Sequence, residues 1–169
     1  MTLLIFVTVA ATADKLSAVE EDVSQNYPSV DHLETSEFLR LNEEKVVLFD
    51  VREEDEFAVS HLPGAVQIDP DLTGEKFLAK YGDFLSNQKR AVFYCSVGVR
   101  SSEMAIRVRK AMGGNEVANL HNLQGGIFRW HNESLPLAKG NNPTDFVHPY
   151  NWRWGRLVNR SDLIRYDPE

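Results

Sequence analysis

The chain has 169 residues, enough for one domain with a sizeable hydrophobic core. Apolar residues make up 43% and charged residues 25% of it, which is ordinary for a globular protein. The formal net charge of −7 disfavours nucleic acid and anionic membranes as partners, because both require a basic surface. Cys95 is the only cysteine, so an internal disulfide is excluded and an oxidised Cys95 must be restored by another molecule.

The first residues are apolar from Leu3 to Ala10 and continue into Ala11-Thr12-Ala13. This run is too short to cross a bilayer, so we expect no stable membrane span. The A-x-A pattern is typical of the end of a signal peptide, although no Lys or Arg precedes the run. Residues 1–13 are therefore either a signal peptide, in a periplasmic or secreted protein, or an apolar segment packed on the domain of a cytoplasmic one. Residues 14–29 are polar and form a helix or a linker.

Strands and helices are expected to alternate from residue 30 onward. Runs of apolar and β-branched residues predict strands at 30–33, 46–49, 65–68, 91–94 and 117–120. Helical spacing and capping residues predict helices at 35–41, 53–59, 75–85 and 101–112, with another near Trp130. This alternation predicts an α/β fold with a mainly parallel sheet.

The predicted strand at 91–94 leads into Cys95-Ser96-Val97-Gly98-Val99-Arg100-Ser101-Ser102. The helix that follows directs unpaired N–H groups and positive dipole at Cys95, which favours the reactive thiolate. A lone cysteine is usually a small buried hydrophobe. Such a core residue, however, needs no glycine, arginine and serine pair behind it. We therefore interpret Cys95 as a nucleophile, with a flexible backbone at Gly98, a fixed cation at Arg100 and capped N–H donors at the serines.

The residues of this loop also resemble a known family. Cys95–Ser101 is similar to the active-site loop C-x-x-G-x-R-S of rhodanese-type sulfurtransferases. Three more stretches resemble family motifs and occur in the family's order. Leu48–Arg52 resembles the DVR strand end, and Glu56-Phe57 with His61–Ala65 resembles the EF…GHIPGA signature. Leu123–Trp130 resembles the L-x-G-G-x-x-x-W ending. Ser60 departs from the glycine usual there. The resemblance covers residues 30–137 and implies a rhodanese-like domain, a five-stranded mainly parallel sheet with helices on both faces.

The resemblance also implies a reaction. The Cys95 thiolate takes a sulfane sulfur from a small donor such as thiosulfate, holds it as a persulfide, and passes it to a thiol or cyanide. Backbone N–H groups from Ser96 to Ser101 are expected to cradle the anionic sulfur, as an oxyanion hole does. No cofactor beyond this persulfide is expected. No metal is expected either, because the sequence has no H-x-x-x-H or Cys/His cluster.

Three charged residues, Asp50, Arg52 and Arg100, are expected near the loop. Ligands of open α/β sheets bind at the carboxyl ends of strands, so Asp50 and Cys95 should share one rim. Arg100 is expected to hold the loop by a bidentate pair with a carboxylate, for which Asp50 is our candidate. Arg52 either binds an anionic donor or pairs with a neighbouring glutamate, Glu53 or Glu56. His61 is interpreted as structural, because the matching family histidine orients the turn after it.

Two other functions stay open. Cysteine phosphatases and arsenate reductases also place a thiolate in a loop that binds an anion. The phosphatase motif, however, is C-x5-R, usually with a histidine before the cysteine. Here the spacing is C-x4-R, and Tyr94 precedes Cys95. A non-catalytic rhodanese-like binding module is the second alternative, and the presence of Cys95, Gly98 and Arg100 argues against it.

Residues 138–169 lie beyond the resemblance and interleave aromatic residues with arginines: Phe146, Tyr150, Trp152, Trp154, Arg153, Arg156, Arg160 and Arg165. Such a segment can stack on a ligand or a protein partner. We expect instead that it wraps the domain and buries its tryptophans.

Overall fold

A computed structural model of the chain describes residues 15–41, 45–86, 89–114 and 119–168. The apolar run at 3–10 and its predicted boundary at 13 lie outside these residues. Residues 15–26, for which a helix or a linker was expected, form helix α1 (Lys15–Asn26). No helix in the described part of the chain is both long and apolar enough to cross a membrane.

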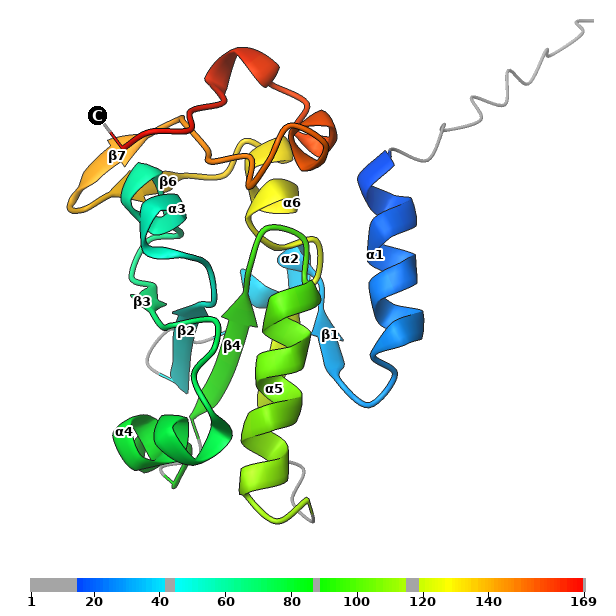
Figure 1. Cartoon of the computed structure of the whole chain (residues 1–169), viewed down its shortest axis with the longest axis vertical. Helices are drawn as coiled ribbons and strands as arrows, with labels where there is room; N and C mark the ends of the chain where they lie inside the picture. The colour runs from blue at the N-terminus through cyan, green and yellow to red at the C-terminus, as the bar shows by residue number, and fades with distance from the viewer. Residues whose placement is uncertain (1–14, 42–44, 87–88, 115–118, 169) are drawn as a thin grey trace, which may run out of the picture.

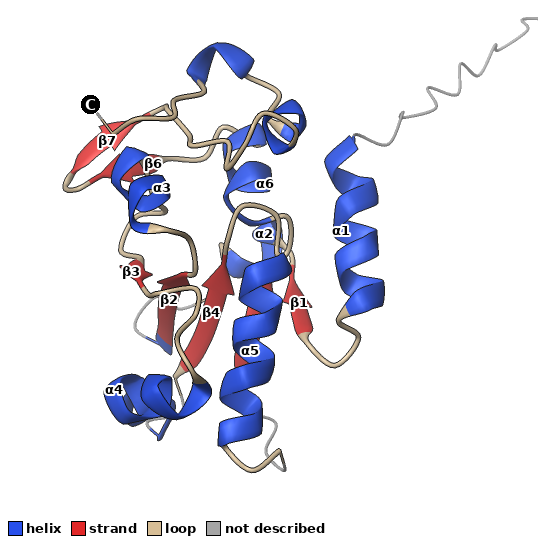
Figure 2. Cartoon of the chain, viewed as in Figure 1, coloured by secondary structure: helices blue, strands red, loops and turns tan. Residues whose placement is uncertain are grey.

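The described residues form a five-stranded sheet in which every pairing is parallel. Its strands follow the order β1-β5-β4-β2-β3, which places β4 in the centre (Figure 2). In chain order the strands are β1 (Asp31–Leu33), β2 (Val46–Asp50), β3 (Val66–Gln67), β4 (Arg90–Tyr94) and β5 (Leu120–Leu123). The predicted α/β fold with a parallel sheet is therefore confirmed.

Helices cover both faces of the sheet, as predicted. The helices are α2 (Thr35–Phe38), α3 (Glu54–Val59), α4 (Gly74–Ser86), α5 (Val99–Ala111) and α6 (Gly126–Asn132). Successive residues of β4 point to opposite faces, so Phe93 packs with α4 and α5 while Val92 packs with α1 and α6. The two faces thus have separate hydrophobic cores, and β4 is buried between them.

Several element boundaries differ from the prediction, most of them by one residue. Helix α2 ends at Phe38, whereas the prediction extended it to residue 41. The last strand was expected at 117–120, of which 117 and 118 lie outside the described residues, but β5 runs from Leu120 to Leu123. Its middle residues, His121 and Asn122, are polar, and polar residues hide a buried strand from hydrophobicity patterns. Helix α5 begins at Val99, two residues before the predicted start at Ser101.

The C-terminal segment lies over the carboxyl ends of the strands, above the loop that follows β4 (orange to red in Figure 1). It contains the hairpin β6 (Leu137–Lys139) and β7 (Asn142–Thr144), followed by two short 3-10 helices. Val147 and Val158 anchor it in the same core as Trp130. The expected burial of its tryptophans is wrong for Trp152, which stays 59% exposed.

Candidate active site

Cys95 follows β4 directly and is almost fully buried, at 1% exposure. Its Sγ accepts a hydrogen bond from the backbone N–H of Gly98 at 3.2 Å. The hydroxyl oxygen of Ser101 lies 3.5 Å from the same sulfur. The loop thus folds back over the thiol and directs the N–H of Gly98, the N-cap of α5, toward the sulfur, an arrangement that favours negative charge there.

Gly98 makes this turn possible. Its φ of 111° lies in the left-handed region, which L side chains rarely adopt. A Cβ at this position would also lie 3.0 Å from the Nδ2 of Asn122. Gly98 is the N-cap of α5 without a side-chain cap bond, so the expected capping role of the serines is wrong. Ser102 instead donates its hydroxyl to the carbonyl of Gly98.

The loop is braced from one side by an ion pair between Arg100 and Glu56. Arg100 donates from Nη1 to Oε2 of Glu56 at 2.7 Å and from Nη2 to Oε1 at 3.0 Å. Ser96 joins this pair, donating to Glu56 and accepting from Arg100. The expected bidentate pair therefore exists, but its carboxylate is Glu56 on α3, and not Asp50.

This pair stays ionised at neutral pH. Burial would raise the pKa of Glu56, but the hydrogen bonds and charge of Arg100 bring it below its usual value. For Arg100, burial acts to lower the pKa, while the hydrogen bond to Glu56 and the charge on Cys95 raise it above normal. The site therefore holds a permanent cation beside the thiol.

Asp50 and Arg52 form a second, deeper pair beneath the loop. Both are fully buried, and Arg52 Nη2 lies 2.6 Å from Asp50 Oδ2. Tyr94 donates its hydroxyl to the same carboxylate, which links β2 to β4. Both expectations for Arg52 are thus wrong, because it pairs with Asp50 rather than with a glutamate and is closed to solvent. Asp50 lies on the expected rim, but it supports Arg52 and Tyr94.

The remaining loop residues belong to the scaffold. Val97 is buried in the core, and Val99 is partly buried against the same core.

The His61 ring stacks on Phe57 with centroids 4.0 Å apart, and its Nδ1 lies 3.1 Å from the carbonyl oxygen of Leu62. These contacts agree with a structural role for His61.

Helix α6 holds the loop through backbone hydrogen bonds, a support that the sequence did not predict. The backbone N–H of Ile127 donates to the carbonyl of Cys95 at 2.9 Å, and that of Phe128 donates to Ser96 at 3.1 Å. A Cβ at Gly126 would collide with the Cys95 carbonyl oxygen. The glycine at 126 is the signal in the sequence that two backbones meet here at close range.

Tyr150 reaches the site from the C-terminal segment. The guanidinium carbon of Arg100 lies 4.8 Å from the centroid of the Tyr150 ring, a cation–π contact. The backbone of Tyr150 is left-handed, with φ of 62°, and is held by a bond from its N–H to Nδ1 of His148. Fifty residues separate Tyr150 from Arg100, so sequence patterns carry no signal for this contact.

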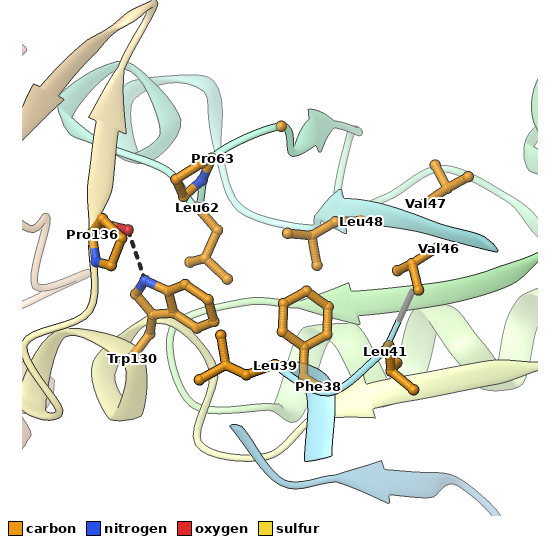
Figure 3. A pocket seen from close by; sticks show the side chains of 11 residues that line it. Phe38, Leu39, Leu41, Val46, Val47, Leu48, Leu62, Pro63, Trp130 and Pro136 are labelled. Carbon is orange, nitrogen blue, oxygen red and sulfur yellow. Dashed lines mark hydrogen bonds between the residues drawn. The ribbon is translucent and has the colours of Figure 1, made fainter. Parts of the chain in front are cut away.

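A separate apolar pocket of about 560 Å³ lies on the face of the sheet covered by α2 and α6 (Figure 3). Trp130 closes one side of it and donates its indole N–H to the carbonyl of Pro136. None of its lining residues is titratable or nucleophilic: Phe38, Leu39, Leu41, Val46, Val47, Leu48, Leu62, Pro63, Gly64, Trp130 and Pro136. This pocket therefore offers no side chain for acid–base or nucleophilic chemistry.

Curated proteins of known sequence match the chain, and two of them illustrate the range. A probable adenylyltransferase/sulfurtransferase, MoeZ of Mycobacterium tuberculosis, is 39% identical over 94 residues, covering 54% of this chain and 22% of that protein. The tRNA uridine(34) hydroxylase of Staphylococcus aureus is 31% identical over 126 residues, covering 72% of this chain and 37% of that protein. The chain thus spans 22% of the length of the first relative and 37% of the length of the second.

Among solved structures, a thiosulfate sulfurtransferase from Pseudomonas aeruginosa shares the fold, with a TM-score of 0.56 at 19% identity over 75% of this chain and 23% of that chain. The model of the rhodanese-like domain matches residues 35–133, from the start of α2 to the end of α6. This match covers more than half of the chain and includes the whole loop around Cys95. The protein belongs to the rhodanese-like domain family.

Proposed function

We propose that this protein is a sulfurtransferase that moves a sulfane sulfur from a small donor to a thiol or cyanide acceptor through a persulfide on Cys95. One observation carries the proposal. The Cys95 sulfur lies inside a loop whose Gly98 N–H points at it, beside a cation held by Glu56. Such a cradle favours an anionic sulfur both before and after transfer.

In the first step, the Cys95 thiolate attacks the outer sulfur of thiosulfate. A new sulfur–sulfur bond forms, the bond within thiosulfate breaks, and sulfite leaves with the electron pair. The outer sulfur remains on Cys95 as a persulfide. Backbone donors at the start of α5 stabilise its terminal negative charge.

In the second step, cyanide or a thiolate attacks the outer sulfur of the persulfide. The bond to Cys95 breaks, and the electron pair returns to Cys95 as a thiolate. Thiocyanate or an acceptor persulfide leaves, and the cycle closes without an oxidant, a metal or a cofactor. The positive charge of Arg100 offsets the charge of the anionic donor and of the departing sulfite.

The comparisons support sulfur transfer as the class of reaction, and they do not identify the sulfur donor. The name of the Mycobacterium tuberculosis relative includes sulfurtransferase. The family match at residues 35–133 includes this loop. Thiosulfate is our proposed donor because it is small and anionic, which suits a buried thiol beside an arginine. The C-x4-R spacing is one residue shorter than the phosphatase loop and argues against phosphate as substrate.

A turnover assay tests this proposal. Purified protein with thiosulfate and cyanide is expected to form thiocyanate, and the Cys95→Ser variant is expected to form none. An aryl phosphate in the same buffer should not be cleaved. A folded, reduced protein that turns over neither thiosulfate nor other sulfane donors would instead support a binding module, and aryl phosphate cleavage would support the phosphatase alternative.

A further inference from the structure

A line of hydrogen bonds leads away from Cys95 to the edge of the sheet. Ser101 lies 3.5 Å from the Cys95 sulfur and donates to Oδ1 of Asn122 at 2.7 Å. Nδ2 of Asn122 lies 3.1 Å from Nδ1 of His32. The other ring nitrogen of His32 lies 3.1 Å from the carbonyl oxygen of Tyr27. Ser101 and Asn122 are fully buried, and His32 is half-buried, so His32 is the end of this line that meets solvent.

The direction of these bonds depends on the charge of His32. A carbonyl oxygen only accepts, so Nε2 of His32 must carry the proton that faces Tyr27. In neutral His32 the other nitrogen, Nδ1, is therefore an acceptor. It accepts from the amide nitrogen of Asn122, whose oxygen in turn accepts from Ser101.

Neutral His32 thus commits the only hydroxyl hydrogen of Ser101 to Asn122. The 2.7 Å bond to Asn122 is short, whereas the 3.5 Å approach to sulfur is long. Ser101 then presents a lone pair to Cys95, which suits a thiol that donates its hydrogen. A thiolate in the same place receives no help from Ser101.

Protonation of His32 reverses the donor and acceptor roles in the hydrogen bonds from His32 through Asn122 to Ser101. Both ring nitrogens then donate, so the Asn122 amide must turn over and present its oxygen to Nδ1. Its amide nitrogen now donates to Ser101, and the Ser101 hydroxyl becomes free to donate to sulfur. This arrangement favours the Cys95 thiolate, since a hydrogen bond to a charged acceptor is stronger than one to a neutral group.

We propose that His32 is a positioning residue whose protonation, relayed by Asn122 and Ser101, makes Ser101 a donor to the Cys95 thiolate. The proposal rests on the proposed function in one respect, namely that the Cys95 thiolate is the reactive species. His32 precedes residues 35–133, so the family match does not account for it.

Other charged groups near His32 are already engaged. Its strand neighbour Asp31 forms an ion pair with His121, at 2.8 Å. Residues 31 and 121 lie opposite each other in the register of β1 and β5, one place from the pair of His32 and Asn122. They therefore point to the other face of the sheet. On the face of His32, Glu103 of α5 accepts the hydroxyl hydrogen of Tyr27.

Alkylation of the single cysteine by iodoacetamide, a neutral reagent, tests the proposal at pH 6 and pH 9. His32→Gln mimics the neutral ring, because its amide can donate to Tyr27 and accept from Asn122. We expect this variant to react at least about threefold more slowly than wild type at pH 6, in the range in which histidine side chains ordinarily gain a proton. At pH 9 we expect equal rates, because a histidine side chain ordinarily holds no second proton there and the glutamine imitates the neutral ring.

Two further variants make the test specific. In a Ser101→Ala background the added His32→Gln change should have no effect at pH 6, because the relay is already cut. His121→Gln, on the opposite face, should match wild type at both pH values. Equal rates for wild type and His32→Gln at pH 6, a difference that persists at pH 9, or one that survives Ser101→Ala would each overturn the proposal. Alkylation requires no sulfur transfer, so these results do not depend on whether the protein is a sulfurtransferase.

Discussion

Replacing Glu56 by glutamine removes the charge that holds Arg100 while keeping the shape of the side chain. Glu56 accepts two bonds from Arg100 and one each from Ser96 and the backbone N–H of Glu53. Breaking a buried ion pair from one side typically costs about 3–5 kcal/mol. The Arg100 side chain is 20% exposed and keeps some hydration, so we expect a loss of about 2 kcal/mol in the free energy of unfolding.

Urea denaturation measures this loss, with Glu54→Gln as the control. Glu54 belongs to the same first turn of α3 but is exposed, so its replacement should change stability by less than about 0.5 kcal/mol. Thiocyanate formation by Glu56→Gln should fall at least about tenfold, because about 1.4 kcal/mol of lost positioning corresponds to that factor.

The effect has a defined pH dependence. The folded protein lowers the pKa of Glu56, so the carboxylate stabilises the fold above the unfolded value, which is about 4.3 for glutamate. That contribution is lost as the pH falls through the lower folded value. The stability difference between wild type and Glu56→Gln should therefore shrink below about pH 4. A variant as stable and as active as wild type at pH 7 would refute this account of the loop.

Three other substitutions test separate contacts of the loop. Arg100→Lys should keep the fold but lower thiocyanate formation at least about tenfold, because an ammonium cannot make two parallel bonds to Glu56; full activity would contradict this. Gly98→Ala should lower the free energy of unfolding by about 1–3 kcal/mol, since a side chain meets both an unfavourable φ and Asn122; an unchanged thermal midpoint would count against that strain. Tyr150→Ala should reduce turnover about twofold to fivefold with a stability change below about 1 kcal/mol, as the cation–π contact is partly exposed; kinetics identical to wild type would show that Tyr150 does not position Arg100.

The sheet was predictable because its central strands are continuous apolar runs between turn residues. Ala91 to Tyr94 has no polar interruption, and both faces of β4 are covered by helices. The last strand was placed three residues too early because His121 and Asn122 interrupt it. Each has a partner that only the folded chain supplies, Asp31 of β1 for the histidine and Ser101 of α5 for the asparagine.

The loop itself was predictable from its residue types, but its supports were not. Cys95, Gly98 and Arg100 are adjacent in sequence, so local chemistry identifies them together. The carboxylate that holds Arg100 comes from α3, 44 residues earlier, and several acidic residues there are equivalent in sequence. Only the folded chain distinguishes Glu56, which faces the loop, from Asp50, which Arg52 already occupies.

The contacts of the C-terminal segment were likewise not predictable from its sequence. Its aromatic and basic composition suggested either a binding surface or a wrap around the domain, and the structure shows a wrap anchored by Val147 and Val158. Trp152 is exposed between two arginines, whose guanidinium carbons lie 5.4 and 4.7 Å from its ring. Composition alone does not tell which aromatic side chain becomes the anchor and which stays at the surface.

The intact mass of the protein after anaerobic incubation with thiosulfate tests the central claim most directly. The proposed cycle predicts a gain of one sulfur atom in the wild type, which cyanide reverses and which Cys95→Ser does not show. A folded, reduced wild-type protein that gains no sulfur from thiosulfate, mercaptopyruvate or a persulfide donor would contradict the persulfide mechanism.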